Sequence, residues 1–150
     1  MRQRIMKPPV LIVLTLALPA RALAALGADA SSVARDREAL KGALTVTAKV
    51  AYEIHELKIS TGTAREYLAP GGLVFAVSWQ GRRAPDLRQL LGAYFERYAA
   101  EARAHRTGHH VLSIETPDFV VSAVRFQRGF QGRAILPALI PAGVTRDELR

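Results

Sequence analysis

Cysteine is absent from this chain of 150 residues. Its absence excludes disulfides, cysteine-ligated zinc, iron–sulfur clusters, thiol nucleophiles and a lipidated N-terminal cysteine. A domain of this length can bury enough apolar surface to fold without such links. We therefore expect one domain that is stabilised by its hydrophobic core.

Long apolar runs are also lacking, and no acidic residue precedes Asp29. The main apolar segment, Pro8–Ala20, would rise only about 20 Å as a helix, whereas the hydrocarbon core of a bilayer is roughly 30 Å thick. It follows the basic segment Met1–Lys7 and precedes Ala22-Leu23-Ala24, which is the order of a secretory signal. We predict a signal peptide over residues 1–24 that is cleaved after this motif, rather than an uncleaved anchor or a buried N-terminal helix.

The predicted export changes how the charge is interpreted. The chain has 21 Lys and Arg against 13 Asp and Glu, which gives a net charge of +8. Four of the basic residues precede the predicted cleavage site, so the single domain over residues 25–150 would keep a net charge of +4. We expect a periplasmic location, with extracellular secretion as the alternative, and no transmembrane span after cleavage. This charge is compatible with an envelope protein or an anionic envelope component as partner.

Arginines alternate with aromatic residues over Arg125–Arg133. Such a pattern is typical of nucleic-acid binding, where arginines meet phosphates and rings stack on bases. The apolar positions Val120, Val124 and Phe126 instead predict a strand with Phe126 in the core and the arginines at solvated strand ends. Together with the predicted export, this argues against a nucleic-acid partner.

Apolar residues that alternate with polar ones predict several strands. The first begins at Val46 and continues to Ile59, with a bulge expected near His55 because the alternation shifts there by one residue. Further strands are expected over Ala64–Leu68, Leu73–Trp79, Val111–Thr116, Phe119–Gln127 and Gly132–Leu136.

The clearest helix is predicted from Pro85 to His105, where leucines and aromatic residues recur at helical spacing. Near the N-terminus, Ser32 would cap a short helix over Val33–Leu40, or this stretch is a flexible lead-in. Thr145–Glu148 has the form of a capping box around a single turn or a frayed end. The expected fold class is α+β, with a mainly antiparallel sheet of about five to six strands packed against one long amphipathic helix.

Metal and cofactor sites receive little support. His105, His109 and His110 are near one another in the sequence, and His55 could join them to make a zinc or copper site, but their spacing is not diagnostic of one. They are weak candidates, and we expect no cofactor. The nucleophile signature G-x-S-x-G is absent too.

Four residues of the predicted sheet are candidate ligand-binding residues: His55, Arg65, Tyr67 and Trp79. Arg65 and Tyr67 would share one face of their strand while Glu66 points to the other, and a cross-strand pair of Arg65 with Glu53 or Glu56 is the simpler structural role. The carboxylates of Glu53, Glu56 and Glu66 are interpreted as exposed charges rather than as the acid–base pair of a glycosidase.

Several short motifs along the chain together carry a resemblance to a known family: Gly62-Thr63, Arg65-Glu66-Tyr67, Gly72–Gly81, Pro85-Asp86-Leu87, Leu90-Leu91-Gly92, Tyr94-Phe95, Leu136-Pro137 and Pro141–Val144. With these motifs the sequence resembles a family of exported proteobacterial proteins catalogued as domain of unknown function 2844. The resemblance covers nearly all of the predicted mature chain and implies an exported single domain, but no activity, cofactor or site.

These observations favour an exported envelope protein with a non-enzymatic binding or accessory role. The alternatives are a histidine-based metal-binding protein and a small periplasmic hydrolase. The hydrolase would use His55 as its base, in a site between Tyr52–Leu57 and the loop Gln80–Pro85.

Overall fold

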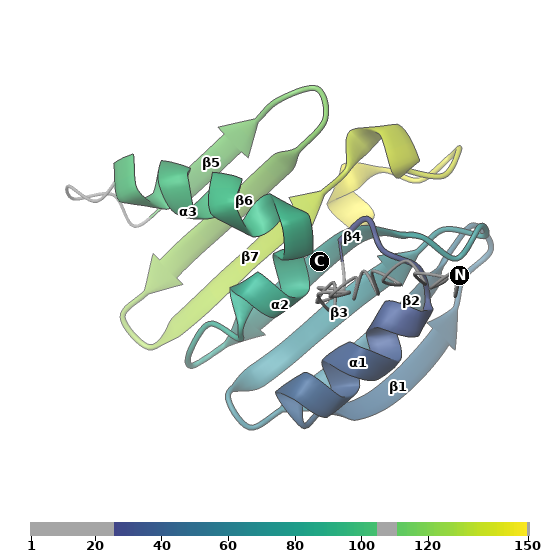
Figure 1. The fold of residues 1–150 in the computed structure, drawn as a ribbon, viewed down its shortest axis with the longest axis horizontal. Coiled ribbons are helices and arrows are strands. Elements are labelled where there is room, and N and C mark those ends of the chain that lie inside the picture. Colours follow the sequence, from purple (N-terminus) through teal and green to yellow (C-terminus); the bar gives the residue numbers. More distant parts are fainter. Residues whose placement is uncertain (1–25, 105–110, 150) are drawn as a thin grey trace, which may run out of the picture.

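The computed structural model describes residues 26–104 and 111–149. The predicted signal peptide, residues 1–24, therefore lies outside the described residues. The strands are β1 (Ala43–Ala48), β2 (Glu53–Ile59), β3 (Gly62–Leu68), β4 (Val74–Gly81), β5 (Val111–Glu115), β6 (Val120–Phe126) and β7 (Gly129–Ile135). The helices are α1 (Ser31–Leu40), α2 (Leu87–Leu91) and α3 (Phe95–Ala104), with short 3-10 turns η1 (Gly92–Tyr94), η2 (Pro137–Leu139) and η3 (Arg146–Glu148). Figure 1 shows one sheet with the helices α1, α2 and α3 on one side of it.

The sheet overturns the predicted fold class. It has seven strands in the order β1-β2-β3-β4-β7-β6-β5, all paired antiparallel. No described helix is longer than the ten residues of α1 and α3. The fold is therefore mostly β, and the prediction of about five to six strands packed against one long helix was wrong.

The missing strand comes from the segment predicted as one strand with a bulge near His55. The chain reverses after Ala48, where the Lys49 amide donates to the Tyr52 carbonyl at 2.8 Å, and returns as β2. The register of β2 is regular against both β1 and β3, so the expected bulge is absent there. The register shift lies instead between Tyr67 and Leu68, opposite β4.

The long predicted helix is broken at Gly92. α2 begins after Asp86, whose carboxylate accepts a hydrogen bond from the Gln89 amide at 3.1 Å, and it ends at Leu91. Gly92 has φ 52° and ψ −123°, a conformation that glycine adopts far more readily than other residues. The chain then makes the η1 turn before α3 begins, so the apolar stripe is divided between two short helices.

α1 resolves the alternatives for the N-terminal stretch in favour of a helix, but Ser32 does not cap it. The N-cap is Ala30, and the Asp29 carboxylate accepts a hydrogen bond from the Ser31 amide at 2.9 Å. Ser32 is fully buried.

None of the described helices is long and apolar enough to cross a membrane.

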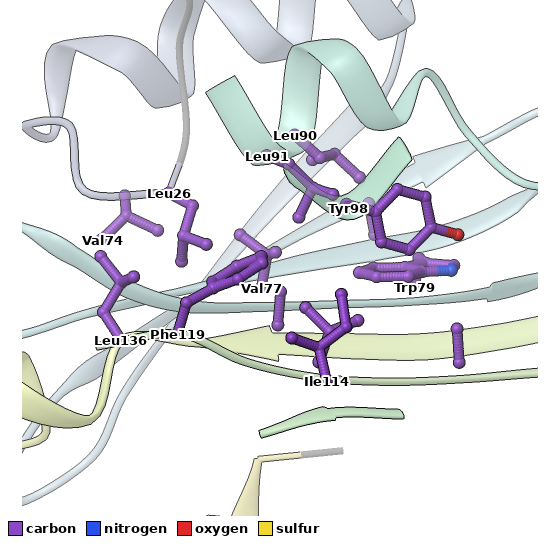
Figure 2. Close-up of a cluster of buried hydrophobic side chains, with 14 of the residues drawn as sticks. Leu26, Val74, Val77, Trp79, Leu90, Leu91, Tyr98, Ile114, Phe119 and Leu136 are labelled. Atoms are coloured by element: carbon purple, nitrogen blue, oxygen red, sulfur yellow. The ribbon is translucent and has the colours of Figure 1, made fainter. Parts of the chain in front are cut away.

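One side of the sheet, which we call the helix face, packs against α1, α2 and α3. Figure 2 shows Leu90 and Leu91 of α2 pointing toward the sheet and the Tyr98 ring of α3 next to the Trp79 indole. Buried members of this core include Leu57, Ala64, Val77, Trp79, Ile114, Phe119, Val121 and Ala134. These side chains alternate along their strands with residues of the opposite side, as the pleat of a sheet requires.

The opposite side, which we call the tail face, is covered in part by the C-terminal segment. Tyr52, Tyr67 and Phe75 form an aromatic cluster there, with ring centroids 5.9 to 6.3 Å apart. Leu149, which follows η3, is 0% exposed within this second core. The capping box at Thr145 and Glu148 is present around the single turn of η3, as the sequence predicted.

Candidate functional site

A hollow of about 260 Å³ lies on the tail face where the central strands meet the end of the C-terminal segment. Its side chains come from β3, β4, β6 and β7, so non-local strand pairing assembles it. β4 pairs with β7, which brings Ser78 opposite Arg133. The lining residues are Thr63, Arg65, Ser78, Trp79, Gln80, Ser122, Val124, Gln131, Gly132, Arg133 and Leu149.

A buried hydroxyl pair belongs to this face. The Tyr67 hydroxyl lies 3.2 Å from Ser78 Oγ, and both residues are buried. Burial raises the pKa of Tyr67 above its ordinary value, while the Ser78 hydrogen bond and the charges of Arg65 and Arg133 act in the opposite direction. The net rise keeps the phenol protonated at neutral pH, so it can donate or accept a hydrogen bond but does not act as a base.

Two arginines line the hollow, and each is held by a hydrogen bond. Arg65 Nε donates to Glu56 Oε2 at 2.7 Å, which is the cross-strand pair that the sequence suggested. Arg133 Nη1 donates to the backbone carbonyl of Arg146 at 2.8 Å, and that bond ties β7 to the C-terminal segment. A guanidinium has five N–H donors in a rigid plane, so one such bond orients it without using its donor capacity up.

The C-terminal segment closes one side of the hollow. Besides accepting the Arg133 bond through its carbonyl, Arg146 donates from Nη1 to Glu115 Oε1 at 2.9 Å. Leu149 then anchors the segment in the tail-face core. A segment fixed at these points gives the hollow a defined wall rather than an open edge.

The chemistry of the hollow is that of a site for negative charge. Its polar groups are two guanidinium groups, the hydroxyls of Thr63, Ser78 and Ser122, and the amides of Gln80 and Gln131. Among the described residues that line it there is no histidine, aspartate or glutamate. Ser78 therefore has no general base beside it in this hollow, since its hydroxyl partner is the protonated Tyr67.

The four predicted ligand-binding residues separate onto two faces. Arg65 and Tyr67 lie on the tail face, at or beside the hollow. Trp79 lies on the helix face, 2% exposed within the core, although it is also one of the residues that border the hollow. His55 on β2 is paired with Glu66 on β3, and the side chain of Glu66 points to the opposite face from those of Arg65 and Tyr67. His55 therefore lies on the helix face.

His55 borders another hollow, of about 390 Å³, formed where the β1–β2 turn meets the β3–β4 turn. Its Nε2 lies 3.3 Å from Glu53 Oε2. The hydrolase hypothesis placed a site between His55 and the loop that follows Gln80. In the sheet, Gln80 is level with Thr63 on β3 and with Lys58 on β2. Lys58 is three residues from His55, about 10 Å along β2, so the structure does not bring His55 next to that loop.

Two other sequence interpretations can be located. Glu66 is fully buried on the helix face, so interpreting it as an exposed charge was wrong. Phe126, predicted in the core, is 54% exposed because it lies at the end of β6 on the tail face, the side of the sheet that the helices do not cover. His105, His109 and His110 lie outside the described residues. Within the described ranges, no three His, Asp or Glu side chains are grouped closely enough to hold a metal ion.

Sequence reasoning missed Ser78 and Arg133. Ser78 fell only within the predicted strand Leu73–Trp79, and Arg133 was interpreted only as one of the arginines at solvated strand ends. The sequence did contain a signal for Arg133. Gln131, Arg133 and Ile135 are two residues apart, so their side chains share one face of the strand, and Arg133 lies beside the apolar Ile135 on that face. The pairing of β7 with β4, which gives that arginine its role, leaves no local trace in the sequence.

A family model described as Protein of unknown function (DUF2844) matches residues 22–149. Neither the curated proteins nor the solved structures contain a match to this chain.

Proposed function

The chain belongs to the DUF2844 family, and we propose that this member is a non-enzymatic binding protein whose tail-face hollow holds a small anionic ligand or the anionic end of a larger one. The proposal includes the export predicted from residues 1–24, with the domain working in the periplasm. A periplasmic domain meets many carboxylate- and phosphate-bearing molecules, so a site of this chemistry has ligands available there.

The observation that carries the proposal is the placement of Arg65 and Arg133 around the buried Tyr67–Ser78 pair. Both arginine charges act on the Tyr67 hydroxyl, so two positive charges lie close to the same buried pair at the edge of the hollow. Guanidinium groups are the preferred partners of carboxylates and phosphates because two of their N–H groups match two oxygens. Glu56 offsets one of the two charges, which leaves the hollow with a net positive charge.

The size of the hollow limits the ligand. About 260 Å³ is slightly below the lower end of typical small-molecule sites. Hydroxyl and amide groups around the arginines can orient a ligand, and Val124 and Leu149 supply the apolar part of the wall. This favours a compact anion with a short polar or apolar extension.

Thermal denaturation of the purified chain with increasing inorganic phosphate, acetate or succinate tests the proposal, with glycerol and putrescine as uncharged and cationic controls. A ligand at one hundred times its Kd stabilises the folded state by about 2.7 kcal/mol. We expect at least one anion to raise the Tm and the cationic control to leave it unchanged. Equal responses to the anions and to the controls would contradict an anion site.

Arg133→Gln should abolish the anion-dependent rise in Tm, while Arg133→Lys, which keeps the charge but not the planar donors, should retain part of it. The matched control is Arg128→Gln, since Arg128 is exposed in the turn between β6 and β7. Loss of the response in the control as well would indicate general charge screening instead of a site. Because Arg133 also holds the C-terminal segment, the ligand-free Tm of each variant is measured first.

A further inference from the structure

β1 forms one edge of the sheet and pairs with β2 over all six of its residues. In Figure 1 it is the outermost strand next to α1, and no other described strand pairs with it. An edge strand presents a row of backbone N–H and C=O groups to whatever lies beside it. Five of the six residues are exposed, among them Val46 at 52%.

The sequence of this edge, Ala-Leu-Thr-Val-Thr-Ala, has none of the features that normally prevent strand pairing. Edge strands are commonly protected by a charged residue, a proline or a bulge. β1 contains no charge and no proline, and its register with β2 is unbroken. The other edge, β5, carries Glu115, which is held by Arg146.

The strand is also complementary to itself about Val46. If a second β1 lies antiparallel with Val46 opposite Val46, then Thr45 faces Thr47 of the other copy and Leu44 faces Ala48. Threonine pairs and β-branched pairs across strands are favourable. In this register Lys49 lies opposite Ala43, so no lysine directly faces a lysine.

We infer that two copies of this chain pair antiparallel through their β1 edges, about a two-fold axis at Val46, and join their sheets into one. The axis is perpendicular to the sheet, so the helix faces of both copies stay on one side and both tail-face hollows on the other. Six residues make a short interface, which is typical of weak association, with a Kd roughly in the micromolar range. This inference does not depend on the proposed anion site.

Sedimentation velocity of the purified chain over a concentration series tests the inference. We expect dimers at high concentration, and Val46→Lys should raise the dimer Kd by at least about tenfold because two like charges would face each other at the axis. Val46→Glu should act in the same way. An equimolar mixture of these two variants should restore the dimer, since a lysine then faces a glutamate.

The restored mixed dimer is the outcome specific to a two-fold axis at Val46. Val111→Lys on β5 is the matched control, because Val111 is an equally exposed valine at 55% on the opposite edge. That variant should dimerise like the parent chain. A chain that stays monomeric at every concentration, a dimer that Val46→Lys leaves intact, or single variants that fail to recombine would each overturn the inference. Circular dichroism and the Tm of each variant confirm that it is folded.

Discussion

The Trp79 indole of β4 covers Gly132, its cross-strand partner on β7. A Cβ at position 132 would lie 2.3 Å from Cζ2 and 2.6 Å from Cε2 of the indole, far inside the ordinary carbon–carbon contact distance. Glycine gives the ring its space, and the ring covers backbone that would otherwise be open, an arrangement used in sheets to compensate for a strand glycine. The pair lies at the boundary between the core of the helix face and the back of the candidate anion site.

Gly132→Ala should therefore destabilise the protein, although alanine is normally better tolerated than glycine in a strand. The added methyl would force the Trp79 ring or β7 to shift, and overpacking of this kind costs about 1–3 kcal/mol. Urea unfolding gives the change in free energy. Gly71→Ala is the control, since nothing lies within 4 Å of a Cβ built there, and it should change stability by much less. Similar effects of the two variants would show that Trp79 can move aside easily.

Leu149→Ala tests whether the C-terminal segment is part of the core. Residues near a chain end usually contribute little, but Leu149 is fully buried against the tail-face aromatic cluster. We expect a loss of at least about 2 kcal/mol in the free energy of unfolding, as for other buried leucines. Leu73→Ala, at a leucine that is 39% exposed, should cost clearly less. An unfolding curve of Leu149→Ala that matches the parent chain would mean that the segment is not docked in solution.

Stability should fall at low pH partly through Asp118. A hydrogen bond from Arg97, and a smaller contribution from a hydrogen bond with Thr116, lower the pKa of this carboxyl below its ordinary value of 3.8. Because the folded-state pKa is the lower one, the stabilisation is complete above the unfolded pKa and is lost as the pH falls through the folded pKa. Unfolding measured from pH 7 downward should show a smaller acid-induced loss for Asp118→Asn than for the parent chain.

A double-mutant cycle separates this ion pair from general acid effects. Arg97 Nη1 lies 2.8 Å from Asp118 Oδ2, and Arg97 Nη2 also donates to Thr116 Oγ1 at 2.8 Å. If the pair lowers the pKa as described, Arg97→Gln should also reduce the acid-induced loss, and the double variant should reduce it no further. Additive effects of the two substitutions would refute the coupling.

Most strands could be located from the sequence because apolar alternation and turn residues coincide, as at Leu73–Trp79. The exception is the stretch from Ala48 to Glu53, where the chain turns without glycine, proline or asparagine and the alternation of apolar residues continues through the turn. Nothing local distinguishes this turn from a continuous strand. The predicted strand count was therefore too low, and a bulge was inferred where two strands meet.

The candidate site was predicted in part. Alternation alone places Arg65 and Tyr67 on one face, and this is where they lie. The same rule, applied to each strand, gives no information on which strands are neighbours. Arg133 reaches Ser78 only because β7 inserts between β4 and β6, which depends on packing across the whole sheet.

The helix break at Gly92 gives a prediction in which the sign of the effect is decisive. Had the helix been continuous from Pro85 to His105, as its apolar spacing indicated, Gly92→Ala would stabilise it by about 1 kcal/mol. Gly92 instead has φ 52°, where a side chain is strained. We expect Gly92→Ala to lower the free energy of unfolding by about 1 kcal/mol or more. Ala100→Gly, at an exposed position inside α3, is the reciprocal control and should be destabilising by the ordinary helix propensity of glycine. A stabilising Gly92→Ala, with the control behaving as expected, would favour the continuous helix over the broken one, because only a regular helix gains from alanine at that position.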